Sequence, residues 1–228
     1  MKKGLIVISL LAVFSSARAQ SGSVQDFELW LKAGAQADLS ENIQLEVEQQ
    51  IRFDENSSEV KNYHTEAGLS FELTDNIDLL WVNRLVRRND NRGEVQGYET
   101  HFRYQLGTQI KHRAGQFRFR HRLLYQHRNE LGRTESEGDI ARQFIRYRFL
   151  TEYKIKNWPY DPRFKVEYFN DLPQEFGNTN DQIRFGIGTE RNYKKIGQFS
   201  IEYMLERSLN IPITELTYIL VFRYEYRF

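Results

Sequence analysis

The C-terminal stretch LTYILVFRYEYRF, residues 216–228, decides the fold. Side chains of a β-strand alternate between two faces, so the stretch separates into two sets. One set is wholly apolar or aromatic: Leu216, Tyr218, Leu220, Phe222, Tyr224, Tyr226 and Phe228. The other set becomes charged towards the chain end: Thr217, Ile219, Val221, Arg223, Glu225 and Arg227. This pattern is typical of a membrane-spanning strand with one face to lipid and one to a polar lumen. An amphipathic strand of a soluble β-sandwich is the alternative.

The start of the chain predicts export. Lys2 and Lys3 form a short positive segment, residues 4–14 are apolar, and Ala17-Arg18-Ala19 has the small-x-small pattern of a cleavage site. We therefore expect residues 1–19 to be a signal peptide and residues 20–228 to form a single domain in the outer membrane. The apolar run is too short to cross a bilayer as a helix. The chain contains no cysteine, so we expect neither disulfides nor a lipid-anchored N-terminal cysteine.

Composition favours a membrane barrel over other classes. Removal of the signal peptide lowers the 32 basic residues to 29 against 31 acidic ones, so the mature chain has no strong field to attract nucleic acid. The sequence combines 28% charged with 14% aromatic residues. A helical membrane protein could not hold so many charges, whereas a barrel with an apolar outside and a polar inside accommodates both.

Alternating segments separated by turn residues recur along the whole chain. They cover residues 26–39, 43–53, 63–73, 77–88, 98–110, 117–127, 142–155, 164–170, 183–193, 199–207 and 216–228. Single-chain bacterial barrels have even strand numbers, so either one segment is miscounted or the first segment does not close the barrel in the usual way. Segment 77–88 is apolar on both faces and segment 164–170 is short, so these two are the weakest. We predict an all-β fold, an antiparallel transmembrane β-barrel of roughly 10–12 strands.

The connections between these segments alternate between short and long. Outer-membrane barrels have short periplasmic turns and longer external loops. We therefore expect the polar connections 54–62, 89–97, 128–140 and 172–181 to face the outside of the cell.

Charged residues gather on the inner face of the predicted strands. Those most relevant to function are Arg118, Arg120, Arg122, Arg146, Arg148, Glu46, Glu48, Glu99, Glu202 and Glu206. Buried charges must be paired or hydrated, so we favour a charge-filled, largely closed lumen without catalytic activity. The alternative is a narrow, anion-preferring channel for small solutes along the Arg118, Arg120 and Arg122 row, because arginine forks suit carboxylates and phosphates.

The histidines do not predict a catalytic site. His64 and His101 lie on the inner face, each two residues from a glutamate, and are expected to join the charge network. His121 and His127 point outward, as does the catalytic pair of outer-membrane phospholipases, but no serine lies two residues from either. No glycine-rich phosphate loop or metal-spaced histidine cluster is present. We expect no catalytic, cofactor-binding or metal-binding residues, with a lipid- or peptide-hydrolysing enzyme as the second alternative.

The chain as a whole resembles a known family. The export signal, the turns Ser40-Glu41-Asn42-Ile43 and Thr74-Asp75-Asn76-Ile77, and the ending Arg223-Tyr224-Glu225-Tyr226-Arg227-Phe228 look like a bacterial outer-membrane barrel family, common in Bacteroidetes-type bacteria and known only as a domain of unknown function. The resemblance implies a barrel and a location in the cell outer membrane, and supplies no active-site residues. The terminal aromatics also resemble the signal read by the barrel-assembly machinery: Phe222, Tyr224, Tyr226 and Phe228. Expected partners are outer-membrane lipid, that machinery, and an extracellular or periplasmic protein still to be identified.

Overall fold

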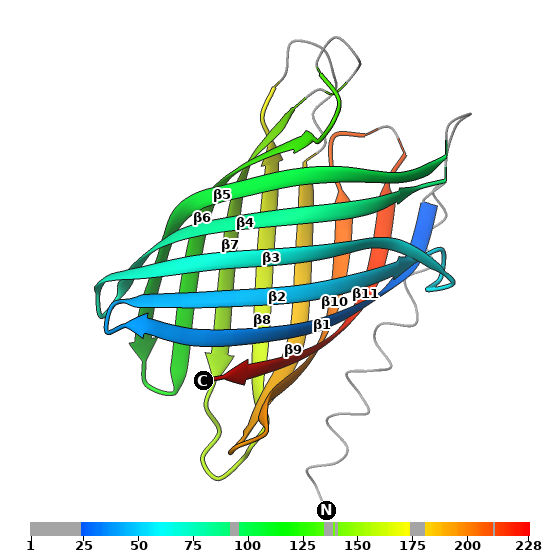
Figure 1. Ribbon diagram of the computed structural model, residues 1–228. Helices are drawn as coiled ribbons and strands as arrows, with labels where there is room; N and C mark the ends of the chain where they lie inside the picture. Colours follow the sequence, from blue (N-terminus) through cyan, green and yellow to red (C-terminus); the bar gives the residue numbers. More distant parts are fainter. Residues whose placement is uncertain (1–23, 92–95, 135–138, 140, 174–180, 212) are drawn as a thin grey trace, which may run out of the picture.

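The computed structural model describes residues 24–91, 96–134, 139, 141–173, 181–211 and 213–228. In this part of the chain all regular secondary structure is β, and eleven strands form one closed barrel (Figure 1). The strands are β1 (Val24–Ser40), β2 (Ile43–Asp54), β3 (Glu59–Thr74), β4 (Ile77–Asp90), β5 (Gly97–Ala114), β6 (Phe117–Glu130), β7 (Arg142–Tyr153), β8 (Asp161–Asp171), β9 (Gln182–Tyr193), β10 (Gly197–Ser208) and β11 (Glu215–Arg227). The predicted β-barrel and its strand number are confirmed. The predicted signal peptide, residues 1–19, lies outside the described residues.

The barrel closes through a parallel pair. Each strand pairs antiparallel with its neighbour in sequence, whereas β1 pairs parallel with β11, with Trp30 opposite Val221. In an up-and-down series of odd length the first and last strands run in the same direction, so their pairing must be parallel. The prediction of a wholly antiparallel barrel is wrong at this seam, and the odd strand count was not a miscount.

The pairing is strongly staggered around the barrel. A path along directly paired residues that leaves β1 at Ser40 crosses β2 to β11 in turn and returns to β1 at Gln25. Such a stagger requires tilted strands, and Figure 1 shows β2–β5 crossing the steeper strands of the opposite wall. Interior residues at the same level along the barrel axis are therefore not the residues that are directly paired with one another across the strands.

The two faces of each strand follow the predicted alternation. Ile219 and Val221 of β11 are buried, whereas the next residue, Phe222, is exposed on the outside. In β4, Leu80 is buried inside whereas Leu79 and Trp81 are exposed outside. The segment that looked ambiguous because it is apolar on both faces is therefore a regular strand with three apolar side chains in the interior.

Connections of different length gather at the two ends. Residues 41–42, 75–76, 115–116, 154–160 and 194–196 lie at one end, called the turn end. The described residues of the other connections lie at the opposite end, called the loop end: 55–58, 91, 96, 131–134, 139, 141, 172–173, 181, 209–211 and 213–214. The predicted connection 54–62 is shorter than expected because β3 already begins at Glu59. The backbone N–H groups of Asn42 and Asn76 donate to the hydroxyls of Ser40 and Thr74, respectively, so the two tight turns share one geometry.

Candidate functional site

The predicted charged residues line the interior, where their partners come from neighbouring strands. The structure places Arg118, Arg120, Arg122, Arg146, Arg148, Glu46, Glu48, Glu99, Glu202 and Glu206 on inward-facing positions of their strands. They do not form one site. Most of them divide between a centre around Glu167, a cluster at the closing seam, and the Arg118, Arg120 and Arg122 row. Glu99 instead contacts His101, and Glu202 pairs with Lys165.

Glu167 of β8 is the centre of the most buried ion cluster. Its side chain is 1% exposed. Arg146 donates to Oε1 at 2.8 Å, Arg148 donates to the same oxygen, and Arg184 donates to Oε2 at 3.1 Å. Arg184 also donates through Nε to Glu206 at 2.9 Å. One carboxylate is thus shared by three guanidinium groups, and its removal would leave Arg146 and Arg148 buried without their direct carboxylate partner.

Guanidinium and aromatic groups alternate across the interior beside this cluster. Arg52 lies 3.6 Å from the ring centre of Trp30, and Arg184 lies 5.1 Å from the same ring. Phe169 in turn has Arg184 at 5.0 Å and Arg146 at 4.8 Å. We call these five residues the lumen stack. Its members come from β2, β1, β9, β8 and β7, so it joins walls of the barrel that are not adjacent.

Further contacts hold the lumen stack in place. The Trp30 indole donates to Glu28 at 2.6 Å, and Lys61 donates to the other oxygen of that carboxylate at 2.5 Å. Trp30 is 4% exposed and packs in one cluster with Met204, Ile219 and Val221. Both edges of the indole are therefore fixed, one by an ion-paired carboxylate and one by an apolar wall.

The closing seam carries a second ion cluster. Arg223 of β11 reaches past β1 to Glu48 of β2, with Nε 3.0 Å from Oε2, and also contacts Glu46. Gly34 of β1 lies directly between these strands, opposite both Glu48 and Glu225. A residue without a side chain leaves room for Arg223 to cross. Lys32 adds a bond to Glu48 at 3.1 Å, so the parallel seam is bridged by charge as well as by backbone pairing.

The arginine row on β6 is only partly paired. Arg118 lies 3.7 Å from Glu152, and Arg122 donates twice to the Gln109 side-chain oxygen, at 3.2 and 2.8 Å. Among the described residues, no carboxylate oxygen lies within 4.0 Å of the Arg120 or Arg122 guanidinium. These two side chains are inward-facing cations that lack a direct anionic partner.

The histidines fall into two environments. His101 contacts Glu99 at 3.2 Å, as the sequence suggested, whereas His64 contacts Asn62 at 3.3 Å because Glu66 instead accepts from Arg84 at 2.5 Å. On the outside, His121 contacts the Tyr147 hydroxyl at 2.8 Å, and the His127 ring stacks on Tyr104. Within the described residues neither outward histidine has a serine or carboxylate partner, so they do not assemble an activated nucleophile.

Within the described part of the chain, no three histidine, aspartate or glutamate side chains lie close enough together to hold a metal ion. The same residues include no helix with the length and hydropathy that a bilayer crossing requires.

Sequence reasoning missed the lumen stack as a unit. Trp30 stands on the inner face of its strand, but its guanidinium contacts come from other strands. A tryptophan on the charged parity, next to an otherwise polar row, is the one signal that could have singled it out.

Comparison with known proteins identifies a family. A family model described as "Protein of unknown function (DUF2490)" matches residues 27–227, so the chain belongs to this family. The resemblance to a family known only as a domain of unknown function is thereby confirmed. No curated protein matches the chain, and no solved structure matches it.

Proposed function

We propose that this member of the DUF2490 family is an integral, non-catalytic barrel of the bacterial outer membrane whose lumen is closed by the lumen stack. The single observation that carries the proposal is the division between the two faces of the wall. The outside exposes Trp81, Leu85, Leu106 and Ile187, whereas the inside holds nearly all of the ion pairs. A water-soluble barrel would have to hydrate this large apolar surface, while a bilayer buries it.

Arginine–tyrosine groups at both ends of the outer wall support the membrane location. At the loop end, Arg87 lies 5.1 Å from the ring centre of Tyr98. At the turn end, Arg191 donates to the Tyr160 hydroxyl at 2.6 Å and lies 4.5 Å from the Tyr193 ring. Aromatic and basic side chains of this kind occur where a membrane protein meets the headgroup layer. The apolar surface between the two groups would then face the acyl chains.

Closure of the lumen rests on the size of the groups that fill it. Eight-stranded barrels are filled by ordinary side chains, and larger barrels enclose a cavity unless something occupies it. Here the lumen stack places two aromatic rings and three guanidinium groups across an eleven-stranded barrel. The long connections at the loop end would face outside the cell and present a surface to a partner, and outer-membrane lipid would surround the wall.

A second candidate function is a narrow, anion-preferring channel. The observation that favours it is the lack of a carboxylate beside Arg120 and Arg122. These cations lie towards the turn end, beyond the lumen stack, so in a closed barrel they would line a vestibule. Conduction would require the stack to move aside.

The terminal aromatics fit an assembly signal. Phe222, Tyr224 and Tyr226 lie on the outer parity of β11, the strand that completes the closing seam, and Phe228 follows the last residue of that strand on the same parity. We assign them to recognition by the barrel-assembly machinery, since the strand would be available for pairing until β1 closes against it.

Cysteine labelling tests the location and the orientation together. The chain has no native cysteine, so each introduced thiol reports alone. Gln96→Cys, at the loop end, is expected to react in intact cells with a maleimide that does not cross the outer membrane. Glu41→Cys, at the turn end, is expected to react only after the membrane is permeabilised. Both side chains are exposed in the structure, so a difference reports the side of the membrane.

A pair of adjacent residues supplies the matched control for insertion. Leu123 is 51% exposed on the outer wall and Leu124 is 2% exposed inside. A fluorophore on Leu123→Cys should be quenched by nitroxide-labelled lipid, and one on Leu124→Cys should not. Equal labelling of Gln96→Cys and Glu41→Cys in intact cells, or no lipid quenching at either leucine, would contradict an outer-membrane barrel.

A further inference from the structure

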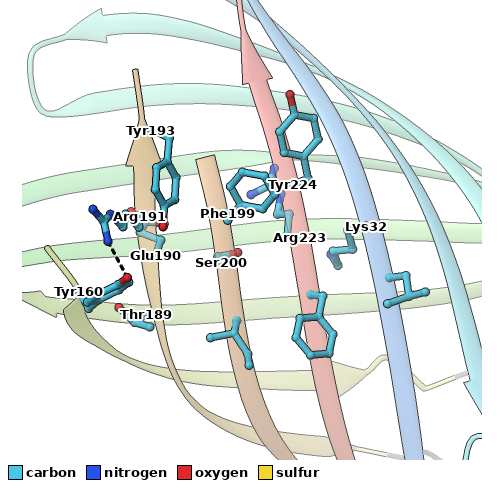
Figure 2. Close-up of a pocket in the computed structure, with 13 residues that line it drawn as sticks. Lys32, Tyr160, Thr189, Glu190, Arg191, Tyr193, Phe199, Ser200, Arg223 and Tyr224 are labelled. Atoms are coloured by element: carbon cyan, nitrogen blue, oxygen red, sulfur yellow. Dashed lines mark hydrogen bonds between the residues drawn. The ribbon is translucent and has the colours of Figure 1, made fainter. Parts of the chain in front are cut away.

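The outer wall is hollowed beside the closing seam. A hollow of about 470 Å³ lies over β9, β10, β11 and β1 near the turn end. Its lining is mainly outward-facing and apolar, with Phe199, Ile201, Phe222 and Leu31 among the contributors (Figure 2). Its volume lies within the range of small-molecule sites.

The pairing register explains the shape of the hollow. Ile201, Phe222 and Leu31 lie directly opposite one another on adjacent strands. One step nearer the turn end, Phe199 and Tyr224 stand opposite each other with ring centres 5.0 Å apart. The hollow is therefore an apolar depression with an aromatic border on the side of the turn end.

Arg191 stands at this aromatic border. It lies opposite Phe199 in the register, and its guanidinium meets Tyr160 beside β9 in Figure 2. Its hydrogen bond goes to the Tyr160 hydroxyl, and its other neighbours are the faces of Tyr160 at 5.0 Å and Tyr193 at 4.5 Å. Among the described residues, no carboxylate oxygen lies within 4.0 Å of it. Arg191 thus keeps several unused donors on an apolar wall.

Arg191 is placed to bind an anion from outside the chain. A guanidinium presents five donors in a planar fork that matches phosphate oxygens. Ion pairs gain strength where water is scarce, and an unpaired charge there is costly. Because the donors adjoin an apolar hollow, the fitting ligand has an anionic head and a hydrocarbon chain.

We infer that Arg191, with Tyr160 and Tyr193, binds the phosphate of a membrane phospholipid whose acyl chain lies in the hollow over Phe199, Ile201 and Phe222. The inference rests on the proposed membrane location, which places Arg191 at the headgroup layer. The outer wall would then have one specific lipid-binding position, whereas the rest of the wall contacts lipid non-specifically.

Native mass spectrometry of the detergent-solubilised protein tests the inference. The probe is phosphatidylglycerol added at a fixed concentration. The wild-type chain is expected to retain one lipid after collisional activation, and Arg191→Gln to bind it about tenfold more weakly, which corresponds to the loss of one charge-assisted contact. Arg191→Lys keeps the charge but not the planar fork of donors, so its lipid affinity should lie between those of the wild type and Arg191→Gln.

Arg87→Gln is the matched control. Arg87 is likewise an outward arginine that lies over a tyrosine ring, but it lies away from the hollow, so its loss should leave lipid retention unchanged. Equal retention by all variants would overturn the specific site. Displacement of the lipid by inorganic phosphate at the same concentration would assign the site to free phosphate and overturn the role of the hollow.

Vesicle flotation separates this inference from the membrane location. Wild type, Arg191→Gln and Arg87→Gln should all float with phosphatidylglycerol-containing liposomes and show the same heat-dependent gel shift. If the wild type does not float, the proposed location is wrong. If all three float but retain lipid equally, only the phosphate site is wrong.

Discussion

Replacing Glu167 by glutamine is expected to lower the free energy of unfolding by about 3–5 kcal/mol, the range observed when one partner of a buried ion pair is removed. The change keeps the side-chain size but removes the negative charge that Arg146, Arg148 and Arg184 share. These guanidinium groups would then repel one another in the interior. Urea unfolding of the protein in lipid vesicles, followed by tryptophan fluorescence, measures the effect as a shift in midpoint.

Glu202→Gln is the control for this prediction. Glu202 pairs with Lys165 at 2.7 Å, but its side chain is 25% exposed and it has a single cationic partner. Its loss should cost less than the loss of Glu167, because it leaves one cation rather than several without a direct partner. The double change Glu167→Gln with Arg148→Gln should recover part of the lost stability by removing one of the repelling charges. Equal effects of Glu167→Gln and Glu202→Gln would mean that Glu167 is not the centre of the cluster.

The strands and their faces could be predicted because both depend on local sequence. A period of two along β11 distinguishes Phe222 from Val221 without any knowledge of the neighbours. The same rule assigns every predicted interior charge to the inward parity of its strand. Even β4, which is apolar on both faces, begins and ends close to the predicted boundaries.

The parallel seam could not be predicted in the same way. Which strands meet when the sheet closes depends on the total number of strands and on the stagger, both properties of the whole chain. The sequence did indicate eleven segments, and that odd number already conflicted with an antiparallel closure. Gly34, which lies opposite Glu225 of β11 and Glu48 of β2, takes this position only from the closure.

Interior partners were the least predictable feature. Residues two apart on one strand share a face, which made Glu66 the expected partner of His64. Glu66 instead pairs with Arg84, directly opposite on the adjacent strand, where the distance is shorter. The contact of Trp30 with Arg184 depends on two further strands between them and on the tilt of all four, so no local pattern could reveal it.

Opening the lumen stack is expected to convert a silent barrel into a conducting one. In Trp30→Ala with Phe169→Ala, two rings are lost from the interior, while Arg52, Arg184 and Arg146 remain. Water would enter the space because the remaining walls are charged. Planar-bilayer recordings should show no steady openings for the wild type and steady openings for the double variant. The openings should prefer anions, because the guanidinium groups that pack against the two rings in the wild type would then line the conducting path.

Two outward aromatics of the same kinds on other parts of the wall supply the control. Trp81→Ala with Phe164→Ala removes the same two ring types from the outer face, where Trp81 and Phe164 are exposed, and should remain silent. Adding Arg120→Gln and Arg122→Gln to the opened variant should weaken its anion preference, since among the described residues neither guanidinium has a carboxylate oxygen within 4.0 Å to offset its charge. Steady openings from the wild type would reject closure by the stack and favour the channel. Silence of an opened variant that still shows the heat-dependent gel shift would mean that the barrel is closed at another level.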